Sequence, residues 1–339
     1  MNLKQLIPAD FSGFVNIRSN SDPLLVEAYG YRDLPNKIKN NVDTIFGTAS
    51  GGKTFVAVAI MKLIEEQNIG IDHPIDQILS TKLPNIDSSV TIHQLLNHTS
   101  GIGDYYDEEV LSDYSELWTD FPNYKIRKNS DLLPLFIDKK MTSIPGKTFQ
   151  YNNTGYVILA MIIEELTGQD FDRYLKQVIF EPAGMHSTGY FALDRLPANV
   201  ANAYIYDEKT AEYYTNIYSI DAKGTGAGGC FTTLKDLDQF WQTLFSGKII
   251  TKQAVELMQT MQASDYYGYG FWIAKNEGQP FPYMQGQDPG ISFISSYDRS
   301  ANRTITIMSN LGQDVWTLHK KISATLSEIG NDANSYKEI

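Results

Sequence analysis

Cysteine is almost absent from this chain. The 339 residues contain one cysteine, Cys230. A single thiol cannot form an intrachain disulfide, and it cannot supply the thiolates of a metal cage. Because Cys230 stands in Gly-Gly-Cys-Phe without an evident partner, we interpret it as a small buried side chain. The histidines show no metal-ligand spacing, so the sequence predicts neither a metal nor a cofactor.

Basic residues and long apolar runs are also scarce. Lys and Arg number 28 against 40 Asp and Glu, a formal net charge of −12. A nucleic-acid surface needs clustered basic side chains, and no apolar run approaches the roughly 20 residues of a membrane span. Residues 1–10 lack the apolar segment and cleavage site of a signal peptide. We therefore expect no nucleic-acid partner, no membrane span, and a cytoplasmic location unless an export signal has been removed.

Strand signals lie near both ends of the chain, and helical signals lie mainly between them. Alternating or β-branched runs predict strands at 14–17, 24–29, 269–274, 291–297 and 303–309. Apolar residues at helical spacing predict helices at 55–66, 153–166 and 315–329. Thr91 can open a short helix that ends near residue 96, and Gly168 can end the second long helix.

This order predicts an α+β fold. We expect an antiparallel sheet flanked by helices, built from residues 1–75 and 225–339, with an all-α insertion over 76–224. The Tyr-, Asp- and Asn-rich residues 103–130 suggest a surface loop or lid, whose aromatic side chains either line a substrate groove or pack the lid. The active site is expected in the cleft between the two parts.

The octapeptide Gly47–Thr54, Gly-Thr-Ala-Ser-Gly-Gly-Lys-Thr, fits two unrelated catalytic patterns. As G-x-x-x-x-G-K-T it is a phosphate-binding P-loop, in which Lys53 and Thr54 hold a nucleotide and its magnesium. As S-x-x-K it makes Ser50 an acylating nucleophile and Lys53 the amine one helical turn away. In a third interpretation Ser50 is an ordinary helix cap and Lys53 is solvated.

The surrounding sequence favours the serine pattern. A P-loop follows a buried parallel strand and needs a later apolar strand that ends in aspartate, but the best match, 157–163, continues at helical period. Tyr151 offers a phenol that can act as base if a nearby ammonium lowers its pKa. Asn153 can bridge Lys53 and a substrate amide, and the N–H of Ser50 at a helix start can bind an oxyanion.

Five segments in the same order resemble the penicillin-recognising serine hydrolases. This group contains class C β-lactamases, DD-carboxypeptidases, D-aminopeptidases and related esterases. The segments are 43–55, 95–102, 145–156, 180–188 and 227–237. The resemblance implies a β-lactamase/transpeptidase-like fold and acyl transfer through Ser50, with Lys53 and Tyr151 moving its proton. No cofactor is implied, and the substrate is a small molecule or a peptide.

The third motif departs from the family pattern. The family places Lys-Thr-Gly or His-x-Gly shortly before Pro-Gly, and counting back from Pro289 and Gly290 puts Met284-Gln-Gly there. Gly286 keeps the small residue that lets a substrate lie against the strand, and Gln287 can give the second oxyanion N–H. Met284 cannot supply the cation that family members use to receive a substrate carboxylate. We therefore expect weak β-lactamase activity.

Other residues compete for roles in the site. Tyr214 and Asn216 repeat the spacing of Tyr151 and Asn153 without the surrounding family sequence. His98 is interpreted as holding a turn. Asp288 is interpreted likewise. The prediction is a serine hydrolase of amide, peptide or ester bonds; the alternatives are a catalytically impaired binder or sensor and, more remotely, a P-loop nucleotide hydrolase.

Overall fold

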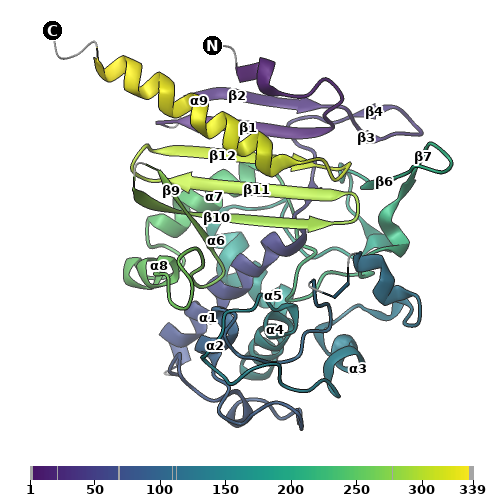
Figure 1. The fold of residues 1–339 in the computed structure, drawn as a ribbon, viewed down its shortest axis with the longest axis vertical. Helices are drawn as coiled ribbons and strands as arrows, with labels where there is room; N and C mark the ends of the chain where they lie inside the picture. The colour runs from purple at the N-terminus through teal and green to yellow at the C-terminus, as the bar shows by residue number, and fades with distance from the viewer. Residues whose placement is uncertain are drawn as a thin grey trace.

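A six-stranded antiparallel sheet is the framework of the molecule, in the order β2-β1-β12-β11-β10-β9. The computed structural model describes residues 3–20, 22–67, 69–108, 110–111, 113–276 and 278–335. The strands are β1 (Gly13–Ser19), β2 (Asp22–Tyr29), β9 (Trp272–Asn276), β10 (Gln279–Asp288), β11 (Ile291–Asp298) and β12 (Arg303–Ser309). Because β1 pairs with β12 along its whole length, the two ends of the chain form one sheet, as predicted (Figure 1).

The two faces of the sheet bury different apolar clusters, because successive side chains of a strand point to opposite faces. Val15 and Ile17 of β1 pack in the cluster under α9 (Val315–Ser335), the helix that lies across the front of the sheet in Figure 1. Phe14 and Phe293 belong to the larger cluster on the other face, which also contains the buried helices. The sheet is therefore covered on both sides.

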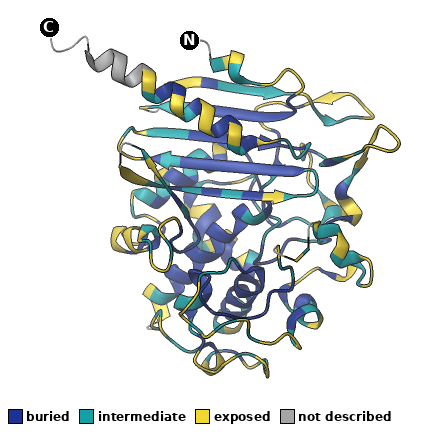
Figure 2. Ribbon diagram, viewed as in Figure 1, coloured by how far each residue is buried: buried dark blue, intermediate teal, exposed yellow. Residues whose placement is uncertain are grey.

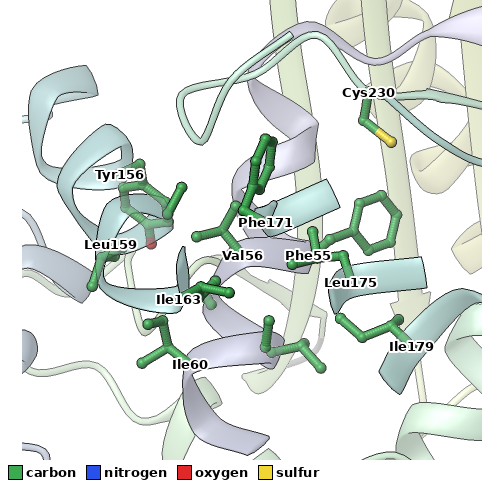
Figure 3. Close-up of a cluster of buried hydrophobic side chains, with 14 of the residues drawn as sticks. Phe55, Val56, Ile60, Tyr156, Leu159, Ile163, Phe171, Leu175, Ile179 and Cys230 are labelled. Atoms are coloured by element: carbon green, nitrogen blue, oxygen red, sulfur yellow. The ribbon is translucent and has the colours of Figure 1, made fainter. Parts of the chain in front are cut away.

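The larger core is centred on two helices, α1 (Lys53–Gln67) and α4 (Asn153–Thr167). Figure 3 shows Phe55, Val56 and Ile60 of α1 near Tyr156, Leu159 and Ile163 of α4. Every residue of α4 from Asn153 to Ile163 is buried, as Figure 2 shows for this helix. A helix that is apolar on all sides is stable only inside a core. Its first residues, Asn153 and Thr154, are consequently buried in the core.

Shorter elements complete the part between the two ends of the sheet. The helices are α2 (Ile92–Leu96), α3 (Leu133–Phe136), α5 (Phe171–Leu175) and α6 (Glu181–Ala183), followed by α7 (Leu234–Phe245) and α8 (Lys252–Gln259). Three small two-stranded sheets join β3 (Tyr31–Asp33) with β4 (Ile38–Lys39), β5 (Phe46–Gly47) with β8 (Phe231–Thr232), and β6 (Tyr204–Asp207) with β7 (Glu212–Thr215). Residues 76–224 are thus not all-α: most of them lie in turns and loops between short helices, and they include the hairpin β6–β7.

Local signals set several helix ends where the sequence placed them. Thr91 caps α2 and forms a capping box with Gln94. Gly168 ends α4 at φ 65°, a conformation that glycine adopts without a Cβ clash. The predicted helix at 55–66 begins two residues earlier, at Lys53, because a 3-10 turn, η2 (Ala49–Gly52), leads directly into it.

Candidate active site

The predicted nucleophile, Ser50, lies in a tight turn between β5 and α1. Ser50 belongs to η2, and the residue before it, Ala49, has φ 47°. Two glycines allow neighbouring backbone to approach this turn. A Cβ on Gly286 of β10 would lie 2.5 Å from Ser50 N, and one on Gly228 would lie 2.8 Å from Ala49 O. A side chain at position 286 would clash with the turn that carries Ser50, so this turn requires glycine there. The predicted role of Gly286, to leave room for a substrate, differs from this one.

Lys53 lies under Ser50 and is almost completely buried. Its Nζ is 2.8 Å from Ser50 Oγ and 2.8 Å from Asn153 Oδ1, and it also donates to Ala227 O. Burial lowers the pKa of Lys53 to about 8, although nearby carboxylates, Glu108 first, oppose the shift. An amine with this pKa is uncharged in a useful fraction of molecules near neutral pH, and only the uncharged form can accept a proton.

Tyr151 stands beside the same hydroxyl. Its phenol has Ser50 as hydrogen-bond partner, and Lys53 Nζ lies 5.0 Å from the centre of its ring. Burial raises the pKa of Tyr151 well above its ordinary value. The expectation that the ammonium would lower this pKa is not met, because desolvation of the phenolate outweighs the other influences. Tyr151 is therefore a neutral phenol.

His98 supports Tyr151 from behind. The two rings lie 4.5 Å apart between centroids, and His98 Nδ1 accepts a hydrogen bond of 3.1 Å from the N–H of Asn152. Burial, with a smaller effect of Lys53, holds the pKa of His98 well below its ordinary value. His98 is a neutral, packed residue at φ 60°, which agrees with its interpretation as a turn residue.

Asp104 orients Asn153, a role that the sequence analysis did not predict. Its carboxylate accepts from Asn153 N at 2.8 Å, from Asn153 Nδ2 at 3.1 Å, and from Thr154 N at 2.9 Å. Asn153 Nδ2 also donates to Tyr106 O. The amide therefore presents its oxygen to Lys53 and uses its nitrogen within the protein, so the predicted bridge from Asn153 to a substrate has only its Lys53 half. The only indication of this role in the sequence is that Asp104 directly follows Gly-Ile-Gly at 101–103.

The edge of β10 forms one side of the site. Strand β9 pairs with β10 only over Gln279–Tyr283, so the edge beyond is open. Asp288 and Ile291 flank a two-residue turn, and such a flanking pair exchanges both of its hydrogen bonds. In the next pair, Gln287 and Ser292, the backbone groups then point outward, which directs the Gln287 N–H to the open edge.

Met284 lies on the same strand but does not reach the cleft. Its side chain is 1% exposed and packs in the larger core. The position that carries a cation in the family pattern thus has neither charge nor access here. Of the predicted set, Ser50, Tyr151, Asn153, Gly286 and Gln287 all line one cleft of about 900 Å³.

Of the competing residues, Tyr214 and Asp288 line the cleft, and Asn216 supports a turn beside it. Asn216 Nδ2 donates to Pro289 O at 2.9 Å and so supports the β10–β11 turn, while Tyr214 is half exposed on β7. Asp288 was predicted to be a turn residue, but it also lines the cleft. Cys230 is buried without access to solvent.

The P-loop interpretation is wrong. The strand before the octapeptide, β5, has two residues and pairs antiparallel with β8, whereas a P-loop follows a parallel strand. Lys53 points to Ser50 and Asn153. Within the described residues, no group of His, Cys, Asp and Glu side chains could hold a metal ion. No helix among those residues has the length and apolarity needed to span a bilayer.

A buried amine and a phenol on one serine hydroxyl, at the base of an open cleft, define a serine acyl hydrolase. The chain belongs to the Beta-lactamase family, whose model matches residues 13–324. The predicted resemblance to the penicillin-recognising serine hydrolases and the predicted α+β fold are confirmed. The enzyme class, a serine hydrolase of amide, peptide or ester bonds, is confirmed as well.

Individual relatives agree with this assignment. The structure is similar to a penicillin-binding protein from Bacillus halodurans, with a TM-score of 0.90 and 34% identity over 95% of this chain and 99% of that one. Penicillin-binding protein 4* of Bacillus subtilis is 28% identical over 90% of this chain and 69% of its own length. Teichoic acid D-alanine hydrolase of Staphylococcus aureus is 28% identical over 79% of this chain and 64% of its own length.

Proposed function

We propose that Ser50 forms the acyl-enzyme and that the uncharged amine of Lys53 takes its proton. The supporting observation is the network in which Lys53 Nζ lies 2.8 Å from both Ser50 Oγ and Asn153 Oδ1. Asn153 and Ala227 hold the amine in place, and burial keeps its pKa near 8. Ser50 attacks the carbonyl carbon of an ester or amide as its proton passes to the amine.

Tyr151 then acts as a proton carrier and not as a phenolate base. As a neutral phenol next to Ser50, it donates its proton to the leaving oxygen or nitrogen while it receives one from Lys53. The N–H groups of Ser50 and Gln287 stabilise the oxyanion. Water attacks the acyl-enzyme in the second half, with the same groups working in reverse.

The substrate is an ester or amide that needs no cation for a carboxylate. Met284 is buried at the position that would carry that cation, so hydrolysis of β-lactams is expected to be weak. A relative named for removing D-alanine from teichoic acid supports small esters as the first class to test.

A catalytically impaired binder is the second candidate, and the altered third motif favours it. Such a protein would acylate at Ser50 but fail to release the acyl group. Its cleft and nucleophile would be the same, so only turnover separates the two functions.

Labelling with a fluorophosphonate probe, followed by assays with a chromogenic ester, an amide and a β-lactam, tests both functions. The expected result is labelling and ester turnover, both lost in Ser50→Ala and kept in Ser246→Ala, a matched control on the exposed end of α7. Labelling without turnover of any substrate favours the binder. Labelling that survives in Ser50→Ala would reject Ser50 as the nucleophile.

A further inference from the structure

A second cavity lies between the sheet and α7, on the face of the sheet away from α9. It measures about 440 Å³, and none of the described residues that line it also lines the cleft at Ser50. Side chains of β1, β2, β11 and β12 form one side of this cavity, and α7 forms the other. In Figure 1 this helix lies behind the strands, whereas α9 crosses in front of them. The cavity is therefore a separate feature of the fold that acyl transfer at Ser50 does not use.

Asn16 of β1 is the polar residue at the floor of this cavity. Strand β1 pairs with β2 on one side and with β12 on the other, so its backbone groups are used within the sheet and Asn16 faces the cavity with its side chain. Asn16 is 0% exposed. Its Nδ2 donates to both carboxylate oxygens of Asp238, at 3.0 and 3.2 Å. Its Oδ1 accepts no hydrogen bond from any residue that the structure describes.

Asp238 fixes the direction in which this amide points. An ionised carboxylate only accepts hydrogen bonds, so the nitrogen of Asn16 must face Asp238 and the oxygen must point elsewhere. Arg18 Nε, 2.8 Å from Asp238 Oδ2, favours the charged carboxylate and opposes the rise in its pKa that burial causes. A buried amide oxygen without a donor is unfavourable. The fold therefore holds a fixed acceptor whose donor has to come from outside the chain.

The rest of the cavity is mostly apolar and carries no net charge. Its apolar and aromatic lining residues are Phe14, Val26, Val42, Leu234, Trp241 and Tyr297. The charged residues of the lining balance each other, with Arg18 and Lys235 against Asp43 and Asp238. An ion therefore gains little here, whereas an apolar group gains by leaving water. A cavity of this size, with apolar walls and a few placed polar groups, is typical of small-molecule sites.

We propose that this cavity is a second ligand site, which binds a small uncharged molecule with an apolar body and an N–H or O–H group that donates to Asn16 Oδ1. Water can also donate to this oxygen, but water leaves the apolar walls hydrated. A ligand with an apolar body satisfies the acceptor and the walls together. The inference goes beyond the proposed function, because binding here needs neither Ser50 nor turnover.

Two pairs of probes with matched shapes test the proposal: benzamide against acetophenone, and phenol against toluene. The first member of each pair carries the donor that the second lacks. Dissociation constants are measured with the whole chain by saturation-transfer NMR titration. We expect the donor to tighten binding about fivefold or more, the scale of one hydrogen bond to a buried acceptor. A preference in both pairs, or in one of them, supports the proposal, and the second result also tells an amide ligand from a hydroxyl ligand.

Two variants place the binding in this cavity. Asn16→Leu removes the acceptor and keeps the approximate size of the side chain, so the ratio within each pair should fall to about one. Continued binding of acetophenone shows that this variant is folded. Val26→Phe fills part of the cavity from a partly buried position on β2 and should weaken all four probes about tenfold or more. Leu24→Phe, on the exposed part of the same strand and outside the cavity, is the matched control and should change nothing.

Three results would overturn the proposal. The first is equal affinity within both pairs, or no binding of any probe up to its solubility. The second is a preference for the donor that survives in Asn16→Leu. The third is binding that Val26→Phe leaves intact, which would place the probes elsewhere on the molecule, such as the cleft at Ser50. None of these results depends on ester hydrolysis, so the proposed function is tested separately.

Discussion

The two walls of the cleft differ in how many hydrogen bonds their polar side chains make. We call the side around Ser50, Lys53 and Asn153 the nucleophile wall, and the side with Asp221 and Asp288 the substrate wall. On the nucleophile wall, Lys53 has three hydrogen-bond partners and Asp104 accepts from Asn153 and Thr154. On the opposite wall, Asp288 accepts no hydrogen bond from the described residues. The nucleophile wall is thus organised before a substrate arrives, as electrostatic preorganisation requires, whereas the carboxylate of Asp288 is not held by hydrogen bonds from the described residues.

Substitution of Lys53 by Ala should have the largest effect, because it removes the centre of the organised wall. We expect the acylation rate with a chromogenic ester to fall about 10³-fold or more, within the range for loss of a general base. Lys62→Ala, a partly exposed lysine of the same helix paired with Glu66, is the control and should keep full activity. Retention of a tenth of the rate in Lys53→Ala, measured by burst kinetics, would remove Lys53 from the role of base.

Tyr151→Phe comes next. The ring, its contact with His98 and its place near Lys53 remain, so the variant removes only the hydroxyl. Acylation should slow by about 10²-fold or more, and amides should suffer more than activated esters, since a nitrogen leaving group needs a proton most. An equal loss for both substrate types would argue that Tyr151 merely positions Ser50.

The pH dependence of acylation probes the burial of Lys53. Because desolvation lowers its pKa to about 8, the rate should rise about tenfold per pH unit below this value and level off above it. Asp104 raises the pKa of Lys53, so Asp104→Asn should move the midpoint to lower pH as well as reduce the rate. Asp87→Asn, an exposed residue, is the matched control. A profile that is flat from pH 6 to 9 would mean that another group limits acylation.

The difference between the walls also explains what the sequence could predict. Ser50 and Lys53 lie one helical turn apart at the start of α1, and Tyr151 and Asn153 lie at the start of α4. Residues at such helix starts keep a fixed spacing, so the sequence showed them as motifs. The sheet was predictable for a similar reason, since β11 and β12 show their alternation and their turn.

The substrate wall could not be found in this way. Asp221 and Asp288 come from a loop and from the end of a strand, and only the fold brings them together. Asp-Pro-Gly is a turn signal on its own, which is why Asp288 was assigned to a turn. The extent of β10 fixes the position of Asp288, because alternate residues of a strand share a face and Asp288 therefore lies on the same face as Gly286.

Asp288→Asn should have the smallest effect, a change in thermal stability whose sign distinguishes the two walls. In the unfolded chain an aspartate titrates near 4, whereas the pKa of Asp288 is about 8 in the fold. Between these values the folded state binds more protons, so the free energy of unfolding falls as pH rises from about 4 to about 8. Removing the charge should therefore stabilise the protein at pH 8, raising Tm by about 2–4 °C for roughly 1 kcal/mol.

The same substitution should leave Tm unchanged at pH 4, where Asp288 is protonated in the fold. Asp104→Asn, measured alongside, should lower Tm at pH 8, because Asp104 accepts hydrogen bonds from Asn153 and Thr154 that an amide cannot all replace. Opposite signs for Asp104, which is buried beside Asn153, and Asp288, which lines the cleft, would establish that the hydrogen bonds of Asp104 stabilise the fold and that the charge of Asp288 destabilises it. A loss of stability in both variants would show that Asp288 already has its partner within the protein.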